Sequence, residues 1–137
     1  MLLDPENPEY RLGVSQLDDT HLHFMELLNR MESAEKGVFM RLFQELVAHT
    51  EAHFMMEQEL MQTTRFPATR EHVDEHNRVL GELGRFAIRV AKGSLVLGRA
   101  YAIEQLPNWF EVHARTMDSA LAAHLKQHAE VPTVGHY

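Results

Sequence analysis

The sequence predicts an all-α protein, an antiparallel four-helix bundle with up-down-up-down order. Apolar side chains recur at three- and four-residue steps in four long segments. A sustained two-residue alternation and an Asn-Gly hairpin turn, which would indicate strands, are both missing from the sequence. The 137 residues suit a single domain with a real core. The expected helices span about residues 18–36, 38–63, 67–92 and 99–128.

The first helix is expected over residues 18–36, with Asp18 or Asp19 as its N-cap. Gly37 is expected to separate it from the second helix. One face of this segment is apolar except for a single imidazole, and its members are Leu17, His21, Phe24, Leu28 and Met31.

The second helix is expected over residues 38–63 and the third over 67–92. The turn between them ends at Pro67, because proline disfavours helix in the residue before it and is well suited to a first helical turn. The inward stripe of the second helix includes Phe39, Leu42, Leu46, His53 and Leu60, and that of the third includes His72, His76, Val79, Leu80, Leu83, Ala87 and Val90.

The fourth helix is expected over residues 99–128, after a break at Lys92-Gly93-Ser94. Pro107 lies inside this segment, so it either begins the functional part of the helix or kinks it. The stripe here consists of Trp109, His113, Met117, Leu121 and Leu125.

The composition excludes several classes of protein. A formal charge of −7 argues against nucleic acid or an anionic membrane as a partner. The absence of cysteine excludes disulfides, iron–sulfur clusters and thiolate-bound zinc. With no signal peptide and no run of about 18 apolar residues, a cytoplasmic location is expected.

Ten histidines are the unusual feature of the composition, and every expected helix carries at least one in its apolar stripe. A lone histidine in such a stripe is usually a hydrogen-bonded core residue. Burying several unpaired imidazoles is costly, whereas one shared metal centre would satisfy them all. Glu57 adds a carboxylate four residues after His53, on the same helical face.

Asp118 is a weaker candidate from periodicity, because a step of five residues from His113 is about 140° around an ideal helix. A helical irregularity or a carboxylate that reaches sideways would bring the two residues together. The other five histidines are expected at the rim, on the surface or in the tail, namely His23, His49, His124, His128 and His136.

Nitrogen and oxygen ligands of this kind suit iron, zinc, copper or manganese. The Glu-x-x-His motif of ferritin-like bundles is absent. HVDEH, residues 72–76, fits the His-x-x-Glu-His motif of a zinc peptidase with Glu75 as general base, but that reading leaves the other buried imidazoles unexplained. A metal-free bundle is a further alternative.

The order of these residues resembles the hemerythrin family, in particular its single-domain bacterial members, over about residues 13–125. The matching elements are His21, then His53-Phe54-x-x-Glu57, then Pro67 followed by His72-x-x-x-His76, then Trp109-x-x-x-His113-x-x-x-x-Asp118. The resemblance implies a single hemerythrin-like domain, residues 1–137, with two iron ions in a non-haem centre. It implies that His72, His76 and His113 hold one iron, His21 and His53 hold the other, and Glu57, Asp118 and an oxo or hydroxo group bridge them.

The function that the resemblance implies is reversible binding of dioxygen, for transport, storage or delivery, without enzymatic turnover. The alternative is a di-iron redox enzyme or sensor acting on peroxide, nitric oxide or oxygen. Dioxygen is the expected partner, and a monomer is the favoured state. Ala114 stands where bacterial relatives often carry a larger aliphatic residue, which predicts a roomier site and faster autoxidation.

Overall fold

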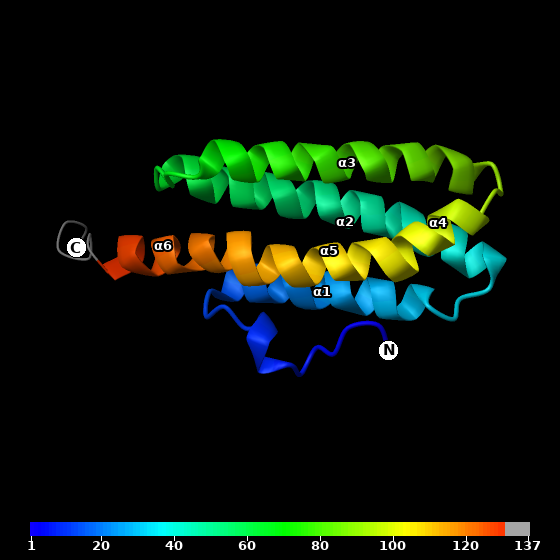
Figure 1. Ribbon diagram of the computed structural model, residues 1–137, viewed down its shortest axis with the longest axis horizontal. Coiled ribbons are helices and arrows are strands. Elements are labelled where there is room, and N and C mark those ends of the chain that lie inside the picture. Colours follow the sequence, from blue (N-terminus) through cyan, green and yellow to red (C-terminus); the bar gives the residue numbers. More distant parts are fainter. Residues whose placement is uncertain (131–137) are drawn as a thin grey trace.

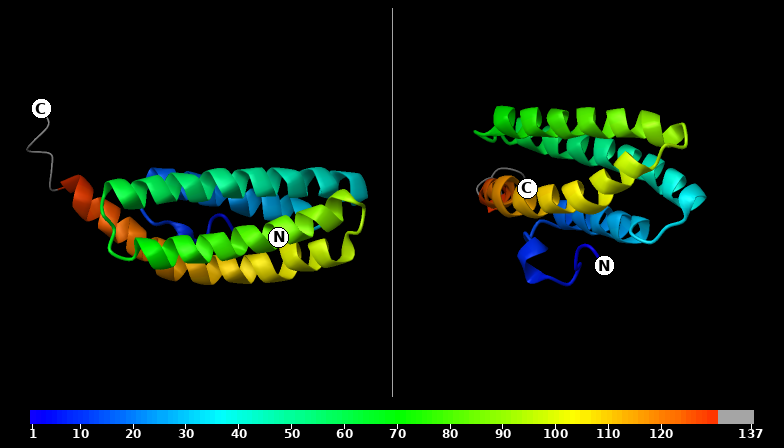
Figure 2. Two further views of the ribbon diagram at one scale, coloured as in Figure 1. Left: turned by 90° about the horizontal axis from the view of Figure 1, so that it is seen from above. Right: turned by 45° about the vertical axis from the view of Figure 1, so that its right-hand side comes forward.

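The computed structural model describes residues 1–130, and within that range every regular element is helical. Three long helices and a fourth, composite helical segment lie side by side (Figures 1 and 2). The helices are α1 (Ser15–Met31), α2 (Lys36–Thr63) and α3 (Thr69–Ala91), preceded by a short 3-10 turn, Pro8–Tyr10. The fourth segment comprises α4 (Val96–Ala100), the π-helical turn η2 (Tyr101–Gln105), α5 (Leu106–His113), the π-helical turn η3 (Ala114–Asp118) and α6 (Ser119–Glu130).

Helix α1 begins earlier and ends earlier than expected. Its N-cap is Val14, so the expected N-cap at Asp18 or Asp19 is wrong. Asp18 lies in the first turn, where its carboxylate accepts hydrogen bonds from the backbone N–H groups of Leu12 (2.8 Å) and Gly13 (3.1 Å). The carboxylate therefore fixes the chain that enters the helix.

The other boundaries differ by smaller amounts. Gly37 does not separate two helices, because it lies in the first turn of α2. Pro67 lies before α3 rather than in it, after a turn in which Arg65 has a positive φ of 57°. Pro107 lies in the first turn of α5, directly after η2, so it begins a segment of regular helix.

The core consists of two apolar clusters separated along the bundle. Leu17 and Phe24 in α1 belong to different clusters, as do Phe54 and Met61 in α2. In both helices the residues between them include buried polar side chains, His21 in α1 and Glu57 in α2. The bundle therefore carries a polar layer across its interior, with apolar packing on either side.

Apart from this layer, burial confirms the predicted stripe of α1 and most of those of α2 and α3, whereas in the fourth segment Leu121 is buried and the other apolar members are half-buried, namely Trp109, Met117 and Leu125. All five members of the α1 stripe are buried, as are Phe39, Leu42 and Leu46 in α2. Within residues 1–130, no helix combines the length and the apolar content needed to cross a membrane.

Candidate metal centre

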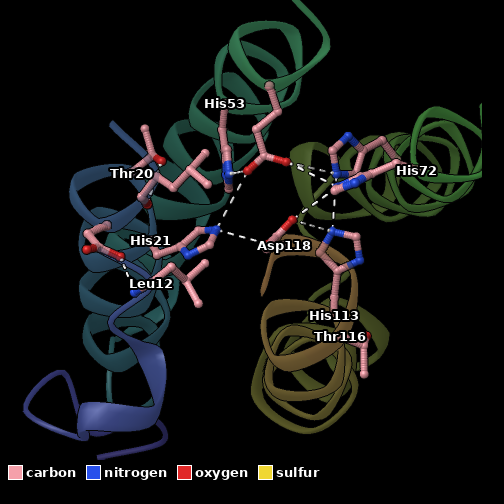
Figure 3. Close-up of polar contacts among 12 residues, drawn as sticks. Leu12, Thr20, His21, His53, His72, His113, Thr116 and Asp118 are labelled. Carbon is pink, nitrogen blue, oxygen red and sulfur yellow. Dashed lines mark hydrogen bonds and ion pairs between the residues drawn. The ribbon is translucent and has the colours of Figure 1, made fainter. Parts of the chain in front are cut away.

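The polar layer is built from all four helical segments, whose side chains converge on one region between the helices (Figure 3). Every member is at most 5% exposed. They are His21 from α1, His53 and Glu57 from α2, His72 and His76 from α3, His113 from α5 and Asp118 from η3. The structure thus brings together all seven residues expected from the sequence.

Glu57 lies between two groups of imidazoles. Its Oε2 is 2.6 Å from the Nε2 of His53 and 3.7 Å from that of His21. Its Oε1 is 3.2 Å from the Nε2 of His72 and 3.5 Å from that of His76. One oxygen of the carboxylate therefore faces each group.

Asp118 repeats this arrangement from the opposite side. Its Oδ2 is 3.0 Å from the Nε2 of His21, while its Oδ1 is 3.0 Å from that of His72 and 3.1 Å from that of His113. The site consequently has two halves: a two-histidine half with His21 and His53, and a three-histidine half with His72, His76 and His113. Each carboxylate presents one oxygen to each half.

The π-helical turn η3 explains how Asp118 reaches the site. A π-helix closes its hydrogen bonds over five residues instead of four, so it holds more residues per turn than an α-helix. The turn Ala114–Asp118 follows His113 directly and spans the five-residue step that ideal periodicity disfavours. Of the two explanations left open by the sequence, the helical irregularity is present.

The two carboxylates are ionised in the absence of metal. Burial would raise the pKa of both, but the surrounding imidazoles reverse this effect and lower the pKa of Glu57 and Asp118. Burial would likewise lower the pKa of His21 and His72, yet the adjacent carboxylates outweigh it and raise both to about 9. The two carboxylates therefore favour the protonated form of His21 and of His72.

His76 behaves differently, because burial dominates and lowers its pKa to about 3. Its ring is stacked on Phe54, with centroids 3.7 Å apart and planes within 3°. Trp109 stacks on His113 in the same way, at 4.5 Å and 20°. Flat apolar faces therefore cover two of the three imidazoles in the three-histidine half.

The donor set fits metal ions better than it fits internal hydrogen bonding. Among the described residues, several buried polar atoms of the site have no hydrogen-bond partner, including His72 Nε2, Glu57 Oε1 and Asp118 Oδ1. His72 Nε2 lies 3.2 Å from Glu57 Oε1 and 3.0 Å from Asp118 Oδ1 without hydrogen-bond geometry, and a shared metal ion would satisfy all three atoms. Two groups lie close enough to hold an ion, one made of Glu57, His72, His76, His113 and Asp118, the other of His21, His53 and Glu57.

The remaining described histidines lie outside this site. His23 and His128 are exposed, and His49 and His124 are half-buried, while His136 lies outside the described residues. Burial is the main reason that the pKa of His49 falls to about 4.

Glu75 does not belong to either group of candidate ligands. It accepts hydrogen bonds from Trp109 Nε1 (2.8 Å) and from the guanidinium of Arg78 (2.9 Å). This engagement argues against the general-base role of a zinc peptidase. The sequence did not indicate that Glu75 accepts a hydrogen bond from the indole of Trp109, which stacks on His113. Glu75 and Trp109 are far apart in the chain, so a local pattern does not connect them.

Comparison with known proteins agrees with this geometry. The sequence model of the family described as "Hemerythrin HHE cation binding domain" matches residues 12–125. The chain belongs to the hemerythrin family.

The chain is similar to several bacteriohemerythrins. One from Ralstonia nicotianae is 35% identical over 116 residues, which cover 85% of this chain and 84% of the relative. A bacteriohemerythrin of Stenotrophomonas maltophilia is 24% identical, covering 88% of this chain and 80% of the relative. One from Pseudomonas aeruginosa is also 24% identical, with coverages of 78% and 71%. No solved structure matches the chain significantly.

Proposed function

We propose that this hemerythrin-family chain binds dioxygen reversibly at a non-haem di-iron centre. The observation that carries the proposal is the division of each buried carboxylate between two groups of imidazoles. A carboxylate with one oxygen toward each of two adjacent positions is suited to bridging two metal ions.

In this proposal, the three-histidine half and the two-histidine half would each hold one ion, and Glu57 and Asp118 would be shared between the two. Two ferrous ions would supply the two electrons that reversible dioxygen binding requires. The two-histidine half provides one imidazole fewer, which leaves room for a small ligand at that ion. The ligands proposed are His21, His53, Glu57, His72, His76, His113 and Asp118.

The residues around the two-histidine half would keep it dry. The ring of Phe110 meets His21 edge-on, with centroids 5.2 Å apart, and Phe24 lies 5.0 Å from Phe110. Phe24, Phe110 and Ala114 are all buried. These apolar side chains would exclude water and slow proton delivery to the site, which would favour reversible binding over oxidation of the centre. The exclusion of water therefore supports oxygen transport or storage as the function, in preference to an enzyme or sensor that acts on peroxide or nitric oxide.

We further infer that the site lies in a single domain whose four helical segments run alternately up and down. The short turns between α1, α2, α3 and the fourth segment support this arrangement.

The first experiment is to load the protein with iron, reduce it without air, admit oxygen and record the visible spectrum over repeated cycles. A carrier gives an absorption band that appears with oxygen and disappears when oxygen is removed. A band that forms once and persists would favour redox turnover. A protein with no visible band and bound zinc would contradict the di-iron assignment.

Ala114 provides a test of pocket size within the same experiment. We expect Ala114→Leu, at a fully buried position directly after His113, to exclude water from the site and to slow autoxidation. Ala123→Leu, on the exposed face of α6, is the matched control and should leave the rate unchanged. An unchanged autoxidation rate in Ala114→Leu would show that the pocket is already closed to water.

A further inference from the structure

We propose that His23 and His49 form a second metal site, at the surface between α1 and α2, for a divalent transition metal ion such as zinc or copper. Neither residue belongs to the seven proposed ligands of the buried centre. The proposal concerns a site other than the one proposed for dioxygen, although His49 lies beside His53, with ring centroids 5.8 Å apart.

The separation of the two rings would allow both imidazoles to bind one ion. The centroids of His23 and His49 are 4.4 Å apart, and their planes are inclined by 56°. Within the buried centre, His72 and His76 have the same separation of 4.4 Å, with planes inclined by 74°. Two imidazoles that share an ion must lie close together, because each directs one ring nitrogen at the metal.

A hydrogen bond to the backbone fixes the tautomer of His49. Its Nε2 lies 3.1 Å from the backbone carbonyl oxygen of Thr20. A carbonyl oxygen only accepts hydrogen bonds, so Nε2 must be the protonated nitrogen, and the lone pair is on Nδ1. Metal-binding histidines typically donate their second ring N–H to a carbonyl or carboxylate, which fixes the tautomer and the ring orientation.

The surroundings favour a cation that arrives from solvent. His23 is exposed and His49 half-buried, so an ion would reach them without opening the bundle. Glu26 lies one helical turn after His23, and Glu45 one turn before His49, both with exposed side chains. Water would complete the coordination shell, as is common for ions held by two protein ligands at a surface.

Another histidine pair offers an internal comparison. His124 and His128 are four residues apart in α6, but their centroids are 6.3 Å apart and their planes are inclined by only 30°. That separation is wider than any pair within either half of the buried centre, where it does not exceed 5.1 Å. We therefore expect the pair in α6 to bind ions more weakly than His23 and His49.

The test is a zinc titration by calorimetry at neutral pH, on iron-loaded protein without a histidine tag, with the iron content measured before and after. We expect about one additional zinc ion per chain in the wild type. His23→Ala should remove it, with no loss of iron, because this side chain is exposed. His49→Gln should also remove it, and His128→Ala should retain it.

Two outcomes would overturn the proposal: no zinc binding beyond the iron-loaded centre, or binding that survives in His23→Ala and is lost in His128→Ala. Either result would leave the di-iron assignment untouched, since iron content and colour are measured separately. As an independent measurement, pulsed electron paramagnetic resonance of one added copper ion should count two coordinated imidazoles in the wild type and one in His23→Ala.

Discussion

Asp118 and Glu57 are the residues on which the two halves of the site depend. Each is nearly inaccessible, and each offers its two oxygens to different groups of imidazoles. Removing the negative charge of one of them should therefore affect both ions, whereas removing a histidine should affect mainly the half to which it belongs.

We expect Asp118→Asn to lower the metal content well below that of the wild type, because an amide is a poor bridging ligand and leaves less negative charge to offset two cations. Elemental analysis of the purified protein measures this, with circular dichroism to verify the fold. Asp74→Asn, an exposed change in α3, is the control. Equal metal content in Asp118→Asn and the wild type would contradict a bridging role for Asp118.

The protonation of the buried imidazoles leads to a prediction for pH. In the folded, metal-free chain, the pKa values of His21 and His72 are raised to about 9, so both are protonated at pH 7. Metal binding must expel these protons, and the apparent affinity should rise with pH between 7 and 9, by up to about tenfold per pH unit for each proton released. Above pH 9 the dependence should flatten.

A pH indicator in weakly buffered solution measures this proton release directly, on addition of ferrous ion under anaerobic conditions. We expect about two protons per chain at pH 7 from these imidazoles. His128→Ala is the control, because its exposed side chain in α6 lies outside both proposed metal sites and should not change the count. Metal uptake without proton release at pH 7 would show that the two imidazoles are neutral in the empty site.

At the scale of elements, the π-helical turn η3 behaves as one residue inserted into an α-helix. Each residue of an α-helix turns the chain by 100°, so deleting a residue normally rotates everything after it to another face. Deleting Thr116 from η3 should instead convert the turn into ordinary α-helix, with His113 and the following aspartate four residues apart on one face. Helix α6, which follows η3, should then keep the same side chains buried against the other helices.

We therefore expect the deletion of Thr116 to fold, with the melting temperature lowered by several degrees and metal bound more weakly, because the aspartate shifts by about 1.5 Å along the axis. Deletion of Glu45, an exposed residue of α2, is the matched control. It should rotate His53 and Glu57 away from the core and prevent folding. Thermal denaturation and metal analysis compare the two, and equal damage from both deletions would contradict the insertion hypothesis.

The same turn shows where sequence periodicity succeeds and where it does not. Residues such as Leu17, His21 and Phe24 could be placed on one face because α1 is regular throughout. The phase of Asp118 could not be derived, since a uniform period of 3.6 residues contains no information about a local π turn. It was the resemblance to a known family, not periodicity, that placed Asp118 in the expected ligand set.

Helix ends were predicted less well than helix faces. Asp18 has the chemistry of an N-cap, but it accepts hydrogen bonds from the chain before the helix instead of capping its first turn. Gly37 lies in a helical first turn, where its small cost is outweighed by packing of the rest of α2. Such choices depend on tertiary contacts that a local pattern does not contain.

At the scale of the whole molecule, the polar layer divides the apolar core into two clusters. Folding without metal leaves buried nitrogen and oxygen atoms of the site without hydrogen bonds, each a cost to the native state. Metal ions that bind only the folded chain would offset this cost. Stability and metal binding should consequently be coupled across all four helical segments.

We expect metal removal to lower the melting temperature markedly. A ligand present at 100 times its dissociation constant stabilises the folded state by about 2.7 kcal/mol, which corresponds to a shift of roughly 10 °C in a chain of this size. Circular dichroism of the loaded protein and of protein stripped with a chelator measures the difference. Asp118→Asn is the control, because a chain that binds metal poorly should lose little on stripping. If the wild type melts at the same temperature with and without metal, the buried centre contributes nothing to stability, and the polar layer must be satisfied by other means.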